Sequence, residues 1–180
     1  MKFEVYDYSW EKLRYLKNDI NQNILGISPK YIKWNFNNQN FIINTKDPSA
    51  NFVLIGEDYL ILQYREKSEE YPYPRNMVIY NFNAVVEHVV EVPFLKTPEV
   101  AFNHQNLQAS FDGFMRLDRK DDTSPYEILI DNQRHVLVSL YDEKHGDSFD
   151  DRAGKPHELQ ALNVETGKFH PTWCKYYGRM

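Results

Sequence analysis

The chain has 180 residues, with 26 acidic and 21 basic side chains, a formal net charge of −5 and a single cysteine, Cys174. One cysteine excludes an intrachain disulfide framework and favours a reducing compartment. The negative charge, without a stripe of clustered Lys and Arg, argues against binding to a nucleic-acid backbone. No run approaches the roughly 18 apolar residues of a membrane span, and the N-terminus MKFEVYDYSW lacks a signal-peptide pattern. We therefore expect one soluble, cytoplasmic domain over residues 1–180.

The N-terminal part predicts a strand, a helix and a hairpin. Residues 2–8 alternate between apolar and polar side chains, which predicts a strand. Ser9 then offers a cap, and apolar residues recur at spacings of three and four, so residues 9–25 are predicted to form the one helix of the protein. The recurring residues are Trp10, Leu13, Leu16, Ile20 and Ile24. Residues 31–36 and 40–45 flank Asn37-Asn38-Gln39 and predict a hairpin, because Asn tolerates positive φ.

The densest run of β-forming residues covers residues 51–93. Residues 51–55 and 59–64 are short apolar runs divided by Gly56-Glu57-Asp58, which predicts a hairpin buried on most of both faces. Residues 65–74 are charged and proline-rich, which predicts a loop. The strand pattern resumes at residues 77–80 and 85–92.

The C-terminal half predicts three further hairpins. They pair residues 107–111 with 114–117 around Asp112-Gly113, residues 126–130 with 135–140, and residues 159–164 with 168–172. Residues 141–158 form the longest polar segment and are predicted to be a loop. Roughly ten to twelve short strands at this spacing predict a mainly β fold: an antiparallel meander of hairpins, built as a sandwich or a partial propeller, with the N-terminal helix beside it.

Two of these hairpins are alike. Residues 78–89 and 159–171 each contain an apolar strand, an Asn near the turn and a second strand with a His. This pattern resembles the outer hairpins of propeller blades such as those of quinoprotein-like and WD-type repeats. The resemblance covers two short segments, without the Gly-His and Trp-Asp signatures. Because a blade needs about 40–45 residues, the chain has room for about four at most.

Two groups of aromatic residues are candidates for a binding surface. Tyr71 and Tyr73 alternate with prolines in the sequence YPYP, and Trp173, Tyr176 and Tyr177 lie near the C-terminus. Exposed aromatic rings contribute large contact areas at interfaces. The alternative interpretation is that both groups pack on the body of the protein and anchor loops.

The polar segment at residues 142–158, DEKHGDSFDDRAGKPHE, is the candidate for metal chemistry. It contains His145, Asp147, Asp150 and His157, which are residue types that bind catalytic metals when they converge. Their spacing fits neither an i,i+4 histidine pair nor a calcium-binding loop, so a solvated loop is the alternative. No phosphate-binding glycine loop or known catalytic motif is present, and we predict neither catalytic residues nor a cofactor.

The leading hypothesis is a small, non-catalytic protein that binds another protein, with neither nucleic acid nor membrane as partner. One version is an immunity protein that inhibits a cationic toxin, because opposite charges speed the encounter of two proteins. The alternative is a metal-dependent hydrolase that uses residues 142–158. A third possibility is an assembly subunit with exposed sheet edges.

Overall fold

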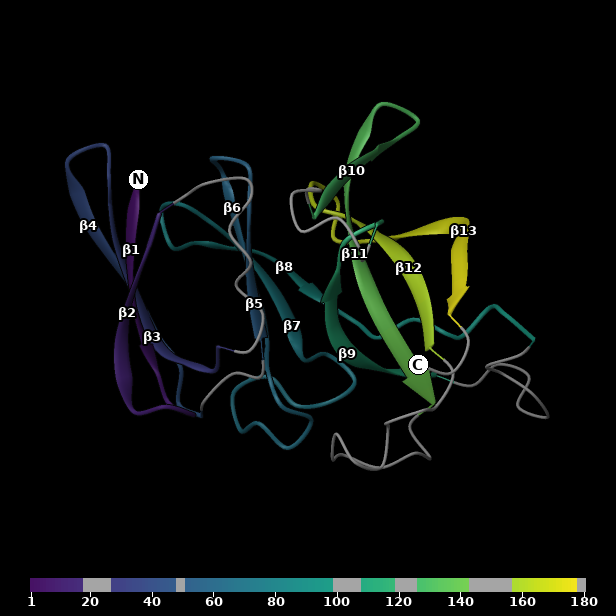
Figure 1. Cartoon of the computed structure of the whole chain (residues 1–180), viewed down its shortest axis with the longest axis horizontal. Helices are drawn as coiled ribbons and strands as arrows, with labels where there is room; N and C mark the ends of the chain where they lie inside the picture. Colours follow the sequence, from purple (N-terminus) through teal and green to yellow (C-terminus); the bar gives the residue numbers. More distant parts are fainter. Residues whose placement is uncertain (18–26, 48–50, 99–107, 119–125, 143–156, 178–180) are drawn as a thin grey trace.

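The computed structural model describes residues 1–17, 27–47, 51–98, 108–118, 126–142 and 157–177. In these ranges the chain forms thirteen strands and no helix. The strands make three antiparallel sheets, which lie in a row along the long axis of the molecule (Figure 1). The prediction of a mainly β fold with antiparallel strands is therefore confirmed.

The N-terminal sheet contains four strands in the order β2-β1-β3-β4. They are β1 (Lys2–Asp7), β2 (Lys12–Lys17), β3 (Pro29–Phe36) and β4 (Gln39–Asn44). The predicted hairpin between β3 and β4 is confirmed. Its turn places Asn37 and Asn38 at φ 50° and 61°, in the left-handed region that Asn tolerates.

The helix predicted over residues 9–25 is wrong in the described part of that range, and residues 18–26 lie outside the description. Residues 12–17 form strand β2, in which Leu13 pairs with Tyr6 and Leu16 pairs with Phe3. The sequence KLRYLK alternates at a period of two as well as showing helical spacing, and pairing with β1 decides between the two patterns. Trp10 is 66% exposed, so the proposed helical stripe is not a buried face.

The middle sheet is a meander of β5 (Asn51–Ile55), β6 (Tyr59–Gln63), β7 (Met77–Asn81) and β8 (Val86–Val90). The predicted hairpin of β5 and β6 is confirmed, and Gly56 in its turn has φ +56°. Residues 64–76 form no strand, in agreement with the predicted loop.

The C-terminal sheet contains β9 (Ala109–Met115), β10 (Glu127–Ile130), β11 (Gln133–Asp142), β12 (His157–Asn163) and β13 (Phe169–Tyr177). Strands β10 and β9 pair with successive parts of the same edge of β11.

Two predictions in this sheet need correction. The Asp112-Gly113 turn does not exist, because β9 runs straight through it with a register shift beside Gly113, whose φ is +133°. The last strand is also longer than the predicted range 168–172, since β13 continues to Tyr177. Of the predicted polar loop at residues 141–158, both ends are strand, and residues 143–156 lie outside the description.

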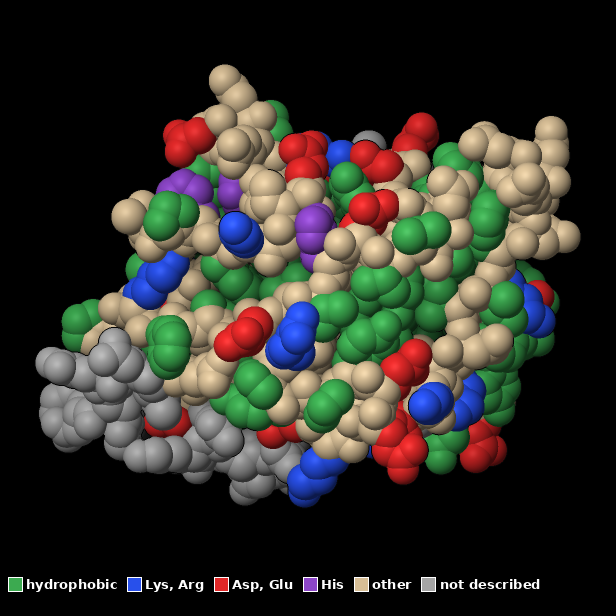
Figure 2. Space-filling view, turned by 180° about the vertical axis from the view of Figure 1, so that it is seen from behind, with side chains coloured by type: hydrophobic (Ala, Val, Ile, Leu, Met, Phe, Trp, Pro, Cys, Tyr) green, Lys and Arg blue, Asp and Glu red, His purple; other side chains and the backbone are tan. Residues whose placement is uncertain are grey.

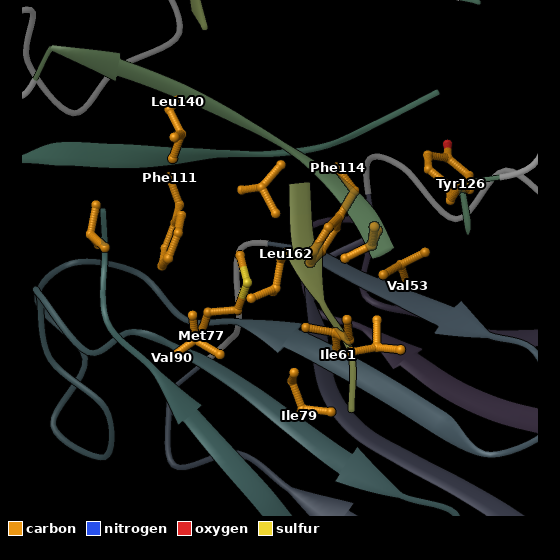
Figure 3. Packing of buried hydrophobic residues seen from close by; sticks show 14 of the residues in the cluster. Val53, Ile61, Met77, Ile79, Val90, Phe111, Phe114, Tyr126, Leu140 and Leu162 are labelled. Atoms are coloured by element: carbon orange, nitrogen blue, oxygen red, sulfur yellow. The ribbon is translucent and has the colours of Figure 1, made fainter. Parts of the chain in front are cut away.

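Strands β5 to β7 of the middle sheet have buried side chains on both faces, because the other two sheets pack against them. In β6, Leu60 and Leu62 face the N-terminal sheet, whereas Ile61 faces the C-terminal sheet, and all three are fully buried. A hydrophobic core therefore lies on each side of the middle sheet. Figure 3 shows the core between the middle and C-terminal sheets, where Ile61, Met77 and Ile79 meet side chains of the C-terminal sheet. Apolar residues on both faces of a strand are what this three-layer arrangement requires.

Polar contacts join the same layers. The Trp34 indole Nε1–H donates a 2.8 Å hydrogen bond to the Phe82 carbonyl, which links the N-terminal and middle sheets. Gln63 Nε2 donates a 3.0 Å bond to the Phe111 carbonyl, which links the middle and C-terminal sheets. Such buried bonds favour one relative position of the sheets, because a displaced donor would lose its partner.

A buried carboxylate holds residues 94–97, which follow β8, against the C-terminal sheet. Glu158 is fully buried and accepts hydrogen bonds from the Thr97 amide and hydroxyl, both at 2.6 Å, and from the Lys96 amide. Gln160 Nε2 donates a 2.7 Å bond to the Phe94 carbonyl. These donors satisfy a group that would be costly to bury alone.

The buried tyrosine pair predicts how stability depends on alkaline pH. The hydroxyls of Tyr64 and Tyr80 are 3.0 Å apart, and burial raises the pKa of both above the ordinary value. In the unfolded chain each ionises near pH ~10, so their stabilising contribution is complete below that pH and is lost as the pH rises above it. The loss amounts to about 1.4 kcal/mol per pH unit for each tyrosine.

We expect the Tyr64→Phe/Tyr80→Phe variant to lose stability less steeply than the wild type above about pH 10. Urea unfolding at a series of pH values from neutral to alkaline measures the two slopes. At neutral pH the two proteins should differ little, because replacing both partners of a hydrogen bond by apolar groups is nearly neutral. Equal slopes above pH ~10 would contradict the assignment.

Candidate functional site

The connection between β6 and β7 is held in place by its own hydrogen bonds. Ser68 Oγ accepts the Glu70 amide at 3.2 Å and lies 3.2 Å from the Asp47 carboxylate, to which it donates. The Tyr73 amide donates to the Glu66 carbonyl at 3.0 Å. The loop therefore presents its side chains from a fixed backbone.

The second half of this loop is fixed against β8. The Arg75 amide donates to the Pro72 carbonyl at 2.9 Å, and the Pro74 carbonyl accepts the Val92 amide at 2.8 Å. The Tyr73–Pro74 peptide bond is cis. These contacts place the YPYP sequence beside the strand that carries Val89.

The loop and β8 enclose a surface hollow of about 390 Å³, which we call the aromatic groove. Its lining consists of Glu70, Tyr71, Pro72, Tyr73, Pro74, Arg75 and Val89. The structure thus brings Tyr71 and Tyr73, two of the residues predicted from sequence, into one site.

Both tyrosines also anchor the loop. The Tyr71 ring lies 4.8 Å from the buried Tyr64 ring and packs on the core between the N-terminal and middle sheets. Tyr73 packs on the core between the middle and C-terminal sheets. Both rings are half-buried, so each one serves the core and still lines the groove.

The composition of the groove suits the binding of a side chain or a peptide segment. Its lining is aromatic, proline-rich and aliphatic, with one carboxylate from Glu70 and one guanidinium from Arg75. Rigid aromatic walls with charges beside them are typical of surfaces that take up a side chain or a peptide segment.

Two of the C-terminal aromatic residues, Trp173 and Tyr176, lie on opposite faces of the C-terminal sheet. Trp173 packs beside Leu159 and Ala161, on the face of the C-terminal sheet turned away from the middle sheet. Tyr176 pairs with Glu158, lies on the opposite face and is 39% exposed. Tyr177 pairs with His157 at the end of the strand.

Cys174 is half-buried in the same strand, opposite Gln160. Burial, and secondly the negative charge of Glu158, raise the pKa of its thiol. A raised pKa keeps the thiol protonated at neutral pH, which opposes a role as nucleophile.

The predicted metal ligands are only partly within the description. His145, Asp147 and Asp150 lie outside the described residues. His157 is buried at the start of β12, with Nε2 3.2 Å from an oxygen of Asp112. The described ranges contain no group of three histidine, cysteine or acidic residues that could hold a metal ion. The metal site therefore stays a prediction.

The sequence analysis missed a second exposed surface, the outer face of the N-terminal sheet. Leu13 and Ile42 are each 44% exposed there, and Tyr15 is 70% exposed. A hollow of about 570 Å³ lies over this face. The alternation of side chains in KLRYLK could have predicted this surface. Read as a strand, the segment places Leu13 and Tyr15 on one face and Arg14 and Leu16 on the other.

Comparison of the chain with models of protein families, with curated proteins and with solved structures finds no match. In the described ranges, no helix has the length and apolar character that crossing a membrane requires. On the face shown in Figure 2, acidic and basic side chains are intermixed around a continuous hydrophobic area.

The half-buried Tyr71 and the exposed Arg75 of the groove should respond differently to substitution. We expect Tyr71→Ala to lower the free energy of unfolding by about 1–3 kcal/mol, because the ring is half-buried against the core. Arg75→Ala should change it by less than about 0.5 kcal/mol, because its side chain is exposed. Urea denaturation measures both. A Tyr71→Ala variant as stable as the wild type would show that the ring does not anchor the loop.

Proposed function

We propose that the protein is a non-catalytic binding module whose partner is another protein, and that the aromatic groove contacts this partner. The observation that carries the proposal is the joining of Tyr71 and Tyr73 with Val89 in a hollow of about 390 Å³. The hydrogen bonds of the loop support it further. A surface that is ordered before binding loses less entropy on association.

The charge of the chain supports a basic partner. The net charge is −5, and acidic residues outnumber basic ones in the middle-sheet region from Asn51 to Val92. Attraction between an acidic protein and a basic one increases the rate of encounter and the salt dependence of binding. An immunity-type inhibitor of a cationic toxin, acting in the cytoplasm, is the specific form of this proposal.

The proposal includes a finer description of the fold as a partial propeller. Three antiparallel sheets of four or five strands follow one another along the chain, and the middle one packs against both others. This series supports blade-like layers over a two-sheet sandwich. Propeller blades are four-stranded sheets that pack in series in this manner.

A binding experiment with host lysate tests the groove. The immobilised wild-type chain should retain one partner, and Val89→Lys should weaken retention at least tenfold, because it places a positive charge in the groove. Arg75→Glu should retain a basic partner as well as or better than the wild type. Raised salt should weaken binding in all cases.

The matched control is Leu129→Lys, which adds the same charge at a side chain that is 69% exposed on β10, in another sheet. It should bind like the wild type. Equal retention by Val89→Lys and Leu129→Lys would exclude the groove as the contact surface. Stronger binding by Val89→Lys than by the wild type would show that the partner is acidic.

A further inference from the structure

The outer face of the N-terminal sheet is an unpartnered sheet face with large apolar side chains. The alternation of each strand turns Glu4 and Tyr6 outward, while Phe3 and Val5 are fully buried against the middle sheet. On the edge strands β2 and β4, Leu13, Tyr15 and Ile42 are exposed. Apolar patches of this kind on a protein surface mark interaction sites.

The register of the sheet arranges the outward side chains in rows across the four strands. The first row runs Tyr15–Glu4–Lys33–Ile42, from β2 through β1 and β3 to β4. The next row runs Leu13–Tyr6–Tyr31–Asn44 in the same strand order.

Contacts within these rows keep the central side chains in place. Lys33 Nζ is 3.5 Å from a Glu4 oxygen and 4.5 Å from the centre of the Tyr31 ring. The Tyr31 hydroxyl donates to Glu4 at 3.2 Å, and the Tyr6 and Tyr31 rings stack 5.7 Å apart. The middle of the face therefore carries one balanced pair of opposite charges beside a pair of stacked rings.

The first row is complementary to itself when it is reversed. Reversing the first row places Tyr15 over Ile42, Glu4 over Lys33, Lys33 over Glu4 and Ile42 over Tyr15. Reversing the second row places Tyr6 over Tyr31 at its centre and Leu13 over Asn44 at its ends, so this row matches only at its centre. A two-fold axis that runs along the strands, between β1 and β3, performs this reversal for both rows at once. A two-fold interface requires a surface that complements itself, and the first row meets this requirement in charge through Glu4 and Lys33.

We propose that two copies of the chain pack the outer faces of their N-terminal sheets together about this axis. Glu4 of each copy then lies over Lys33 of the other, and Tyr15 of each packs with Ile42 of the other across the hollow of about 570 Å³. Two sheets that pack face to face with aligned strands have this general geometry. The inference is independent of the proposed function, because none of the groove residues belongs to this face.

The size of the face sets the expected affinity. Four strands at about 4.8 Å spacing and about six residues in length cover roughly 400 Å² of sheet area. A standard interface buries about 800 Å² of accessible surface on each partner, so this pair, at about half that area, lies below the standard range, among weak and transient interfaces. We therefore expect a reversible dimer in the micromolar range rather than a permanent one.

Analytical ultracentrifugation of the full chain, from low micromolar to several hundred micromolar concentration, tests association. The wild type should pass reversibly from monomer to dimer. Glu4→Lys and Lys33→Glu should each weaken the dimer at least tenfold, because each places like charges opposite one another. The Glu4→Lys/Lys33→Glu variant should recover most of the wild-type affinity. Thermal unfolding of each variant confirms that the fold is kept, and Leu129→Lys serves as the surface control.

Thiol crosslinking tests the axis itself, in a Cys174→Ser background that removes the native thiol. One preparation carries Tyr15→Cys and another carries Ile42→Cys. The two positions lie three strand spacings apart in one chain, about 14 Å, which is too far for an intrachain disulfide. A short thiol-reactive crosslinker should join the two variants when they are mixed, and should join neither variant to itself.

A wild-type chain that stays monomeric throughout the concentration range overturns the proposal, and would leave this face to a different protein. Species larger than a dimer overturn the closed two-fold pair. A dimer that ignores the charge substitutions overturns the choice of face. Crosslinking of Tyr15→Cys or Ile42→Cys alone, as strongly as in the mixture, overturns the axis.

Discussion

The burial of the middle sheet on both faces is the constraint on which the rest of the structure depends. A strand in this position needs apolar side chains in both directions, and β6 provides them with Leu60, Ile61 and Leu62, which are all fully buried. Each of these side chains must be covered, so the chain must supply a sheet on either side. The N-terminal and C-terminal sheets therefore share one central layer, and neither could keep its core without it.

Hydrophobic contact alone would allow the layers to slide, and charged groups at their margins oppose this. Arg134 of the C-terminal sheet binds Asp58 in the β5–β6 turn through two nitrogens and also binds Glu127. The two carboxylates raise the pKa of the Arg134 guanidinium further above its ordinary value. His88 Nε2 lies 2.8 Å from the Glu165 carbonyl in the turn between β12 and β13. Directional contacts of this kind select one arrangement among several with similar apolar burial.

The sequence predicted the hairpins that have strong turn residues, and it failed where pairing between distant segments decides the outcome. Asn37-Asn38 and Gly56 marked real turns, because the backbone there adopts positive φ. Asp112-Gly113 carried the same signal, but the long edge of β11 pairs with β9 on both sides of it and turns the glycine into an irregularity within a strand. Likewise, the spacing of the apolar residues in KLRYLK fits a helix, but pairing with β1 makes this segment a strand. Tyr71 and Tyr73 could be grouped from sequence because only Pro72 separates them, whereas a face made from four strands required their register.

The two candidate surfaces differ in how they arise from the fold. The aromatic groove exists because a loop is tied to the body through rings that enter two cores, so its shape follows from the packing of the middle sheet. The outer face of the N-terminal sheet exists because the row of layers ends there. At the other end of the row the C-terminal sheet buries Leu137, Leu159 and Ala161 on its own outer face. The outer face of the N-terminal sheet thus lies at one end of the row of sheets, and the groove lies apart from it. A two-fold pair formed at that end would present two grooves, and a partner with repeated binding segments would then gain affinity from their linkage without any new contact.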